Sequence, residues 1–113
     1  RVLQISSGAG RSPYPGWSVY CATKAALDQH ARAAALDEVA GLRIASLAPG
    51  VVDTDMQGEI RAVDPARFPL RDRFRAMKED GALTAPQDAA ARIVDYLLSA
   101  DFAADPTPDV RRF

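Results

Sequence analysis

The sequence contains few of the side chains on which disulfide frameworks and metal centres depend. Its 113 residues include a single cysteine, Cys21, and a single histidine, His30. One cysteine excludes an internal disulfide framework, and one histidine leaves no cluster of metal ligands to propose. We therefore predict no metal site, and any catalysis must use other side chains.

Neither charge nor hydropathy favours a macromolecular partner. Fourteen Lys and Arg residues against 15 Asp and Glu give a net charge of −1. This balance provides no basic footprint for nucleic acid or anionic lipid. No apolar run approaches the roughly 20 residues that span a bilayer. We expect a cytoplasmic protein with a small-molecule substrate and with neither nucleic acid nor membrane as a partner.

The first half of the chain has the pattern of an α/β protein. Residues 2–5 form a short apolar run that ends in a polar, glycine-containing loop, which is typical of a buried strand. An alanine-rich helix is predicted over residues 18–40, with Gly41 at the position of a C-cap. Residues 42–47 read as a second strand. This order of strand, helix and strand predicts a right-handed parallel crossover.

The second half is less regular. A short helix is predicted at residues 54–63 and a highly charged one at 71–79, so that residues 51–85 are interpreted as a mobile excursion. Pro86 opens a helix that runs to about Ala100 and should cover the sheet. The tail contains at most a short edge strand near residues 109–112.

Three side chains are candidates for proton chemistry. Tyr20 and Lys24 are four residues apart, so a helix places the phenol and the ammonium on one face. A cation near a phenol favours the phenolate, which helps a tyrosine exchange a proton with a carbonyl or alcohol oxygen. Ser7 follows the first strand and could hold that oxygen. By itself the Tyr-x-x-x-Lys spacing is weak evidence, because most chance matches are a half-buried tyrosine and a solvated lysine.

The context of these residues strengthens the interpretation. Ser6-Ser7-Gly8-Ala9-Gly10, Tyr20-x-x-x-Lys24 and Leu47-Ala-Pro-Gly-Val-Val-Asp-Thr-Asp-Met56 occur in this order at predicted strand and helix ends. Together they resemble the C-terminal catalytic half of the short-chain dehydrogenase/reductase family over nearly the whole chain. The resemblance implies the C-terminal part of a Rossmann-like, doubly wound parallel sheet. Residues 1–113 would then be half of one NAD(P)-binding domain.

The resemblance also implies a role for each candidate residue. Ser7 would orient the substrate oxygen, Tyr20 would act as general acid, and Lys24 would assist Tyr20 and bind the nicotinamide ribose. The cofactor would be NADPH, with NADH possible. The residues implied in binding it are Tyr20, Lys24, Pro49, Gly50, Val52 and Thr54.

A closer resemblance is to the sepiapterin reductase and benzil reductase members of this family. It depends on the segments at residues 16–21 and 53–57. The substrate would then be a ketone or vicinal dicarbonyl, of the sepiapterin or aromatic diketone type. The residues implied in binding it are Ser7, Trp17, Met56, Gln57 and Asp109. For Trp17, Met56 and Gln57 ordinary loop packing remains an alternative, and for Asp109 a solvated edge position does.

The family's glycine-rich nucleotide turn is missing from the sequence. A GxGxxG match starting at Gly8 would need its third glycine at Pro13. The chain also begins with strand-like residues and no Met. We therefore expect Arg1 to lie inside a longer product and these residues alone to be inactive. The main hypothesis is an NAD(P)H-dependent reductase that forms a homodimer or homotetramer through residues 18–40. The alternative is a truncated, non-enzymatic chain that acts through helix-mediated association.

Overall fold

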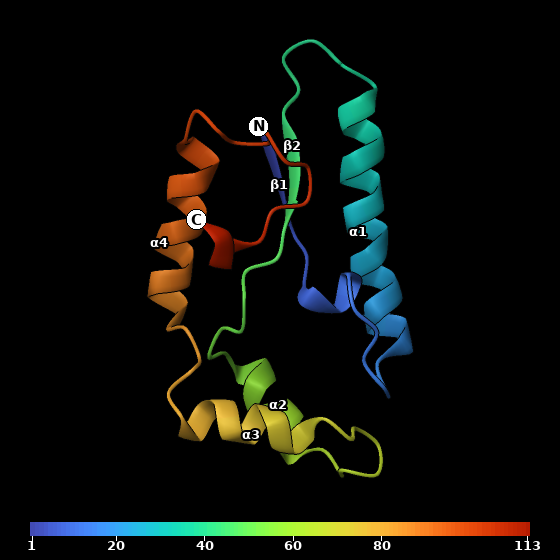
Figure 1. Ribbon diagram of the computed structural model, residues 1–113, viewed down its shortest axis with the longest axis vertical. Coiled ribbons are helices and arrows are strands. Elements are labelled where there is room, and N and C mark those ends of the chain that lie inside the picture. The colour runs from blue at the N-terminus through green and yellow to red at the C-terminus, as the bar shows by residue number, and fades with distance from the viewer.

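The centre of the molecule is a two-stranded parallel sheet. The structure, a computed structural model, describes residues 1–113. Strand β1 (Val2–Ile5) pairs with β2 (Ile44–Leu47), with Val2 opposite Ile44. Helix α1 (Ser18–Leu36) connects the two strands, and Figure 1 shows it on one side of them with α4 (Pro86–Leu98) on the other. The predicted parallel strand, helix and strand unit is confirmed.

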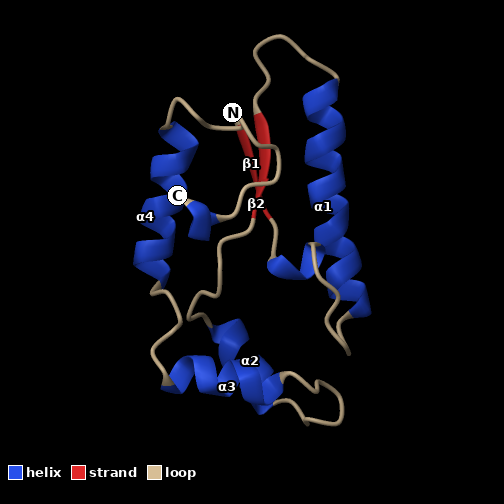
Figure 2. Ribbon diagram, in the orientation of Figure 1, coloured by secondary structure: helices blue, strands red, loops and turns tan.

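The remaining elements lie beyond the sheet or along its edge. Helices α2 (Asp55–Ala62) and α3 (Arg71–Glu79) lie together beyond the carboxyl ends of the strands (Figure 2). There are also two short 3₁₀ helices. The first, η1 (Gly8–Gly10), follows β1, and the second, η2 (Val110–Arg112), is the last element of the chain. None of these helices is long and apolar enough to cross a membrane.

Strand β2 is the buried centre of the sheet. All four of its residues are buried, and the C-terminal tail runs along the edge opposite β1. The backbone N–H groups of Ser46 and Ala48 donate to the carbonyl oxygens of Pro106 and Pro108, at 2.8 and 3.0 Å. The short edge strand predicted near residues 109–112 is reduced to one bridge between Ala48 and Asp109. Instead the Asp109 side chain caps η2 by accepting from the backbone N–H of Arg111.

Several predicted boundaries were too wide. Helix α1 ends at Leu36 and not at Ala40, because the chain turns through positive φ angles at Glu38 and Gly41 to return to β2. The second strand begins at Ile44, two residues later than predicted. Helix α4 ends at Leu98, where Ser99 takes an extended conformation.

Aromatic packing holds residues 51–85 in place. The sequence had been interpreted as mobile in this region. Ile60, Phe68 and Phe74 form a buried apolar cluster that joins α2 to α3. The Trp17 ring, which precedes α1, stacks on Phe68 with centroids 4.7 Å apart. Such aromatic contacts contribute about 0.5–1.5 kcal/mol each beyond the burial of their area. The cluster therefore fixes α2 and α3 relative to the start of α1.

A partly buried ion pair connects four segments of the chain. Asp28 of α1 is only 1% exposed, and it accepts from Arg11 Nε at 3.0 Å and from the Ser46 hydroxyl at 2.8 Å. Arg11 Nη2 also donates to the carbonyl oxygens of Ser46 and Pro108, both at 3.1 Å. Burial alone would raise the pKa of Asp28, but hydrogen bonds from Arg11, Ser6 and Ser46 hold it below its ordinary value. The carboxylate is therefore ionised at neutral pH, and both of its oxygens accept hydrogen bonds.

The Asp28→Asn substitution tests this connection. It removes the counter-charge of the Arg11 guanidinium, whose side chain is 24% exposed, so the cost should be about 1–3 kcal/mol, between those of exposed and fully buried pairs. We expect a loss of that order in the free energy of unfolding, measured by urea titration at pH 7 of the complete protein that contains these residues. The pKa of Asp28 is below the 3.8 of the unfolded chain, so the loss should shrink as the pH falls below about 4. The control is Asp37→Asn at the exposed end of α1, and an equal effect of both substitutions would contradict the assignment.

Candidate active site

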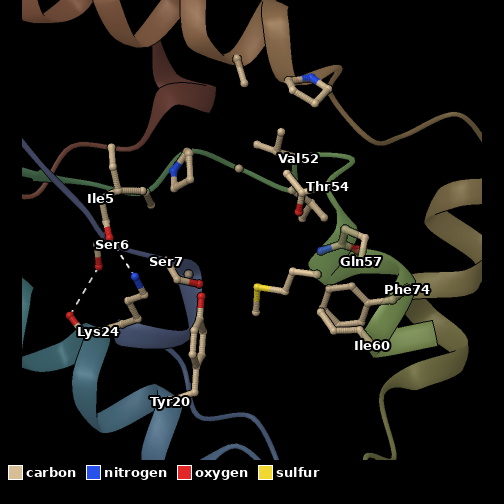
Figure 3. Close-up of a pocket in the computed structure, with 18 of the residues that line it drawn as sticks. Ile5, Ser6, Ser7, Tyr20, Lys24, Val52, Thr54, Gln57, Ile60 and Phe74 are labelled. Atoms are coloured by element: carbon tan, nitrogen blue, oxygen red, sulfur yellow. Dashed lines mark hydrogen bonds between the residues drawn. The ribbon is translucent and has the colours of Figure 1, made fainter. Parts of the chain in front are cut away.

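The end of β1 and the start of α1 bring the three predicted catalytic side chains to one place. Ser7 is the N-cap of η1, and its Oγ accepts from the backbone N–H of Ala9 at 3.1 Å. Tyr20 and Lys24 lie one turn apart on α1, with Lys24 Nζ 5.6 Å from the centroid of the Tyr20 ring. Figure 3 shows the Tyr20 hydroxyl pointing toward Ser7. The proximity expected from the spacing is therefore present.

Lys24 is held in this position from both ends. Its ammonium donates to the carbonyl oxygen of Ile5 at 2.9 Å, and its own carbonyl accepts from the Ser6 hydroxyl at 3.4 Å. Gly10 lies so close to α1 that a Cβ there would be 2.8 Å from the carbonyl carbon of Lys24. Only glycine permits this approach. The loop that carries Ser7 and the helix that carries Tyr20 are thus fixed relative to each other.

These residues line a cavity of about 520 Å³, a volume suited to a small organic ligand. Thirteen of its 23 lining residues are hydrophobic, so recognition depends mainly on apolar contact. The lining includes all but one of the residues predicted to act in catalysis or binding, namely Ser7, Trp17, Tyr20, Lys24, Pro49, Gly50, Val52, Thr54, Met56 and Gln57.

Asp109 is the exception. It was expected to line the pocket, but it is 8% exposed and is absent from the cavity lining. Both of its carboxylate oxygens accept from the Arg111 side chain. The hydrogen bonds from Arg111 lower the pKa of Asp109 to about 2, although burial opposes the change. The alternative of a solvated edge residue does not fit this burial either.

Several lining residues were not predicted from the sequence. Arg111 enters from η2, Phe74 from α3 and Tyr14 from the proline-rich loop before α1. For Arg111 the sequence did contain a signal, because its charge is opposite to that of Asp109, two residues earlier, and could have suggested that the two side chains pair. No local pattern marks Phe74 or Tyr14, because their places depend on how distant segments pack.

The loop after β2 has features that fit a nicotinamide. Gly50 has a φ of +76°, so the chain turns sharply beside the cavity. Thr54 is the N-cap of α2 and makes no side-chain capping bond, which leaves its hydroxyl available. Gln57 is 7% exposed, and its Oε1 is buried without a hydrogen-bond partner. Because an unpaired buried acceptor is costly, a ligand with an N–H donor, such as a carboxamide, fits here.

No group of three His, Cys, Asp or Glu side chains is placed to hold a metal ion.

A family comparison identifies the class of protein. The model of the short chain dehydrogenase family matches residues 1–65, which include the Ser7, Tyr20 and Lys24 positions and the loop after β2. The chain belongs to the short-chain dehydrogenase/reductase family. The resemblance found in the sequence is confirmed, and with it the Rossmann-like α/β fold class.

Individual relatives agree with this assignment. The chain is 44% identical over 105 residues to a benzil reductase ((S)-benzoin forming) of Bacillus cereus, covering 90% of this chain and 42% of that protein. It is 39% identical over 98 residues to sepiapterin reductase of Mus musculus, covering 85% and 36% of the two chains. The chain thus spans about two-fifths of the length of these relatives.

A solved structure supports the fold. The crystal structure of the KRED1-Pglu enzyme superimposes with a TM-score of 0.79 at 36% identity, over 89% of this chain and 44% of that one. The fold of this chain is therefore that of a part of a larger solved enzyme.

A pair of glycine substitutions tests the close approach of η1 to α1. Gly10→Ala forces the backbone of η1 away from Lys24, and overpacking of this kind costs about 1–3 kcal/mol. We expect lower stability in urea titration. Gly58→Ala is the control, since a Cβ at this helical position in α2 meets nothing within 4 Å and should stabilise by up to about 1 kcal/mol. Effects of the same sign at both positions would contradict the packing described here.

Proposed function

We propose that residues 1–113 form the catalytic part of an NAD(P)H-dependent carbonyl reductase. The observation that carries the proposal is the grouping of Ser7, Tyr20 and Lys24 in the wall of one largely apolar cavity. The opposite part of that cavity is lined by the loop after β2. A carbonyl oxygen between Ser7 and Tyr20 would be in reach of two hydroxyl groups.

In this proposal the reaction is the reduction of a ketone to an alcohol. The Ser7 hydroxyl donates a hydrogen bond to the ketone oxygen and orients it. Tyr20 delivers its phenolic proton to that oxygen as negative charge develops there. The ammonium of Lys24, beside the Tyr20 ring, stabilises the phenolate that is left.

The cofactor proposed is NADPH, with NADH as the alternative. A reduced nicotinamide, when bound, supplies the hydride that adds to the carbonyl carbon. On this chain Lys24 would bind its ribose, and Pro49, Gly50 and Val52 would line its ring. Thr54 would bind its carboxamide. Gln57, which the resemblance assigned to the substrate, is proposed here to bind the carboxamide as well, because its buried Oε1 has no hydrogen-bond partner.

The substrate proposed is an aromatic diketone or a sepiapterin-like ketone. The names of the relatives support this class, and so does the chemistry of the lining. Trp17 offers a flat aromatic surface and Met56 a flexible thioether, which together suit a flat substrate.

Replacing Tyr20 by Phe removes only the phenolic hydroxyl. In the complete protein, reduction of benzil with NADPH should fall by about 10²–10⁴-fold, the contribution typical of a general acid. Steady-state kinetics and a nucleotide titration would measure activity and cofactor binding separately. The control is Tyr96→Phe, because the Tyr96 hydroxyl accepts from the backbone of Ala103 and lies outside the cavity lining. Wild-type turnover in Tyr20→Phe would refute the assignment.

We also propose that the complete protein is a homodimer or homotetramer that associates through α1. This helix carries exposed small residues, including Ala26 and Ala33, on its surface away from the sheet. Exposed apolar side chains lie at both of its ends, with Val19 78% and Leu36 83% exposed. Small residues let two helices approach closely.

Replacing Ala33 by Arg tests this association. A symmetric interface contains the substitution twice, so two guanidinium groups would be forced together. We expect a shift to monomers in analytical ultracentrifugation, with the circular dichroism spectrum unchanged. The control is Ala76→Arg on the exposed face of α3. An intact oligomer in Ala33→Arg and in the matching Ala26→Arg variant would contradict the proposal.

A further inference from the structure

Arg111 lies in the wall of the catalytic cavity although it comes from the other end of the chain. Arg111 and Lys24 are the charged residues of the lining, and no carboxylate lines it. The Lys24 ammonium already donates to the carbonyl oxygen of Ile5. The Arg111 side chain is 66% exposed, so a molecule in the cavity can reach its guanidinium.

Asp109 fixes the orientation of this guanidinium. Arg111 Nε donates to Asp109 Oδ1 at 2.9 Å, and Arg111 Nη2 donates to Asp109 Oδ2. Two parallel hydrogen bonds of this kind hold the plane of the guanidinium as well as its position. The Nη1 amino group has no hydrogen-bond partner. It is therefore a donor that is already oriented before a ligand arrives.

The stem of Arg111 packs on the loop proposed to bind the nicotinamide. A Cβ at Gly50 would lie 3.7 Å from Arg111 Cγ and 3.9 Å from Arg111 Cδ. Gly50, Ser7 and Tyr20 line the same cavity. Arg111 thus lies beside the Gly50 loop and lines the same cavity as Ser7 and Tyr20.

The charge of the Arg111 and Asp109 pair restricts the ligand that suits it. Asp109 is ionised at neutral pH, since its pKa is about 2. The pair is then neutral overall and offers N–H donors without a net positive charge. A neutral acceptor such as a carbonyl oxygen fits this arrangement better than a carboxylate, whose desolvation a neutral pair does not offset.

We propose that Arg111 is a specificity-determining residue that binds the second carbonyl oxygen of a vicinal diketone through Nη1. Ser7 and Tyr20 bind the carbonyl that is reduced. Asp109 is then a positioning residue for Arg111 and does not itself contact the substrate. This inference rests on the proposed reductase function and adds to it the group that distinguishes a diketone from a simple ketone.

Matched substrates and variants test the role of Arg111. Benzil carries two adjacent carbonyl groups between its phenyl rings, whereas deoxybenzoin has the same rings and one carbonyl. We would measure kcat/KM for both with NADPH in the complete protein and in Arg111→Gln. The ratio of benzil to deoxybenzoin should fall about tenfold or more, as expected for loss of a hydrogen bond from a charged donor. Arg112→Gln is the control, since the exposed Arg112 is absent from the lining, and its ratio should equal that of the parent.

Arg111→Lys keeps the test decisive if the Gln variant does not fold. Lysine preserves a positive charge opposite Asp109. It lacks the planar guanidinium, which can bind both carboxylate oxygens of Asp109 and still offer a third N–H donor to a ligand. Its ratio of benzil to deoxybenzoin should fall at least threefold. A ratio unchanged in the folded Arg111 variants, or equal losses for both substrates, would overturn the proposal, because equal losses indicate a structural role. A larger loss for benzoylformate, a 2-oxo acid, than for benzil would overturn the choice of a neutral acceptor.

The outcomes also separate this inference from the function on which it rests. If the parent protein reduces both ketones in a Tyr20-dependent manner and Arg111 has no selective effect, only the specificity role fails. If the parent reduces neither ketone, the proposed reductase function fails as well.

Discussion

The contact between the residues that follow β1 and the first half of α1 determines the rest of the site. Gly10 allows the two backbones to touch at Lys24, and one turn further along α1 Arg11 reaches the buried carboxylate of Asp28. Both interactions join the segment just after Ser7 to α1 at Lys24 and one turn beyond it. They therefore restrain the position of Ser7 relative to Tyr20 and Lys24.

Arg11, the cation of this ion pair, also holds the C-terminal tail in place. Arg11 donates to Pro108 as well as to Asp28, so the segment that precedes η2 is tied to the loop of Ser7. Three residues after Pro108, Arg111 lines the cavity. The ion pair that stabilises the fold therefore also restrains the position of Arg111 relative to the loop that carries Ser7.

Packing of aromatic residues completes the other wall. Trp17 stands just before α1 and stacks on Phe68, which in turn packs with Phe74 of α3. Residues 51–85 contribute Met56 and Gln57 to the cavity because this cluster holds α2 in place. A region with weak periodicity thus becomes an ordered wall, and its order comes from contacts between segments about 50 residues apart.

The parallel strand, helix and strand unit, the motif positions and the grouping of Ser7, Tyr20 and Lys24 could all be predicted from the amino-acid sequence. These depend on local information: apolar runs, the one-turn spacing on a helix and a serine at a strand end. The predicted length of α1 was too great, because only the return path to β2 decides where the helix stops. The contact between Asp109 and Arg111 is local, and the opposite charges two residues apart were a signal for it. The places of Tyr14, Phe74 and Arg111 in the cavity wall were not predictable, because they depend on how segments distant in sequence pack, and no local pattern shows which segments meet.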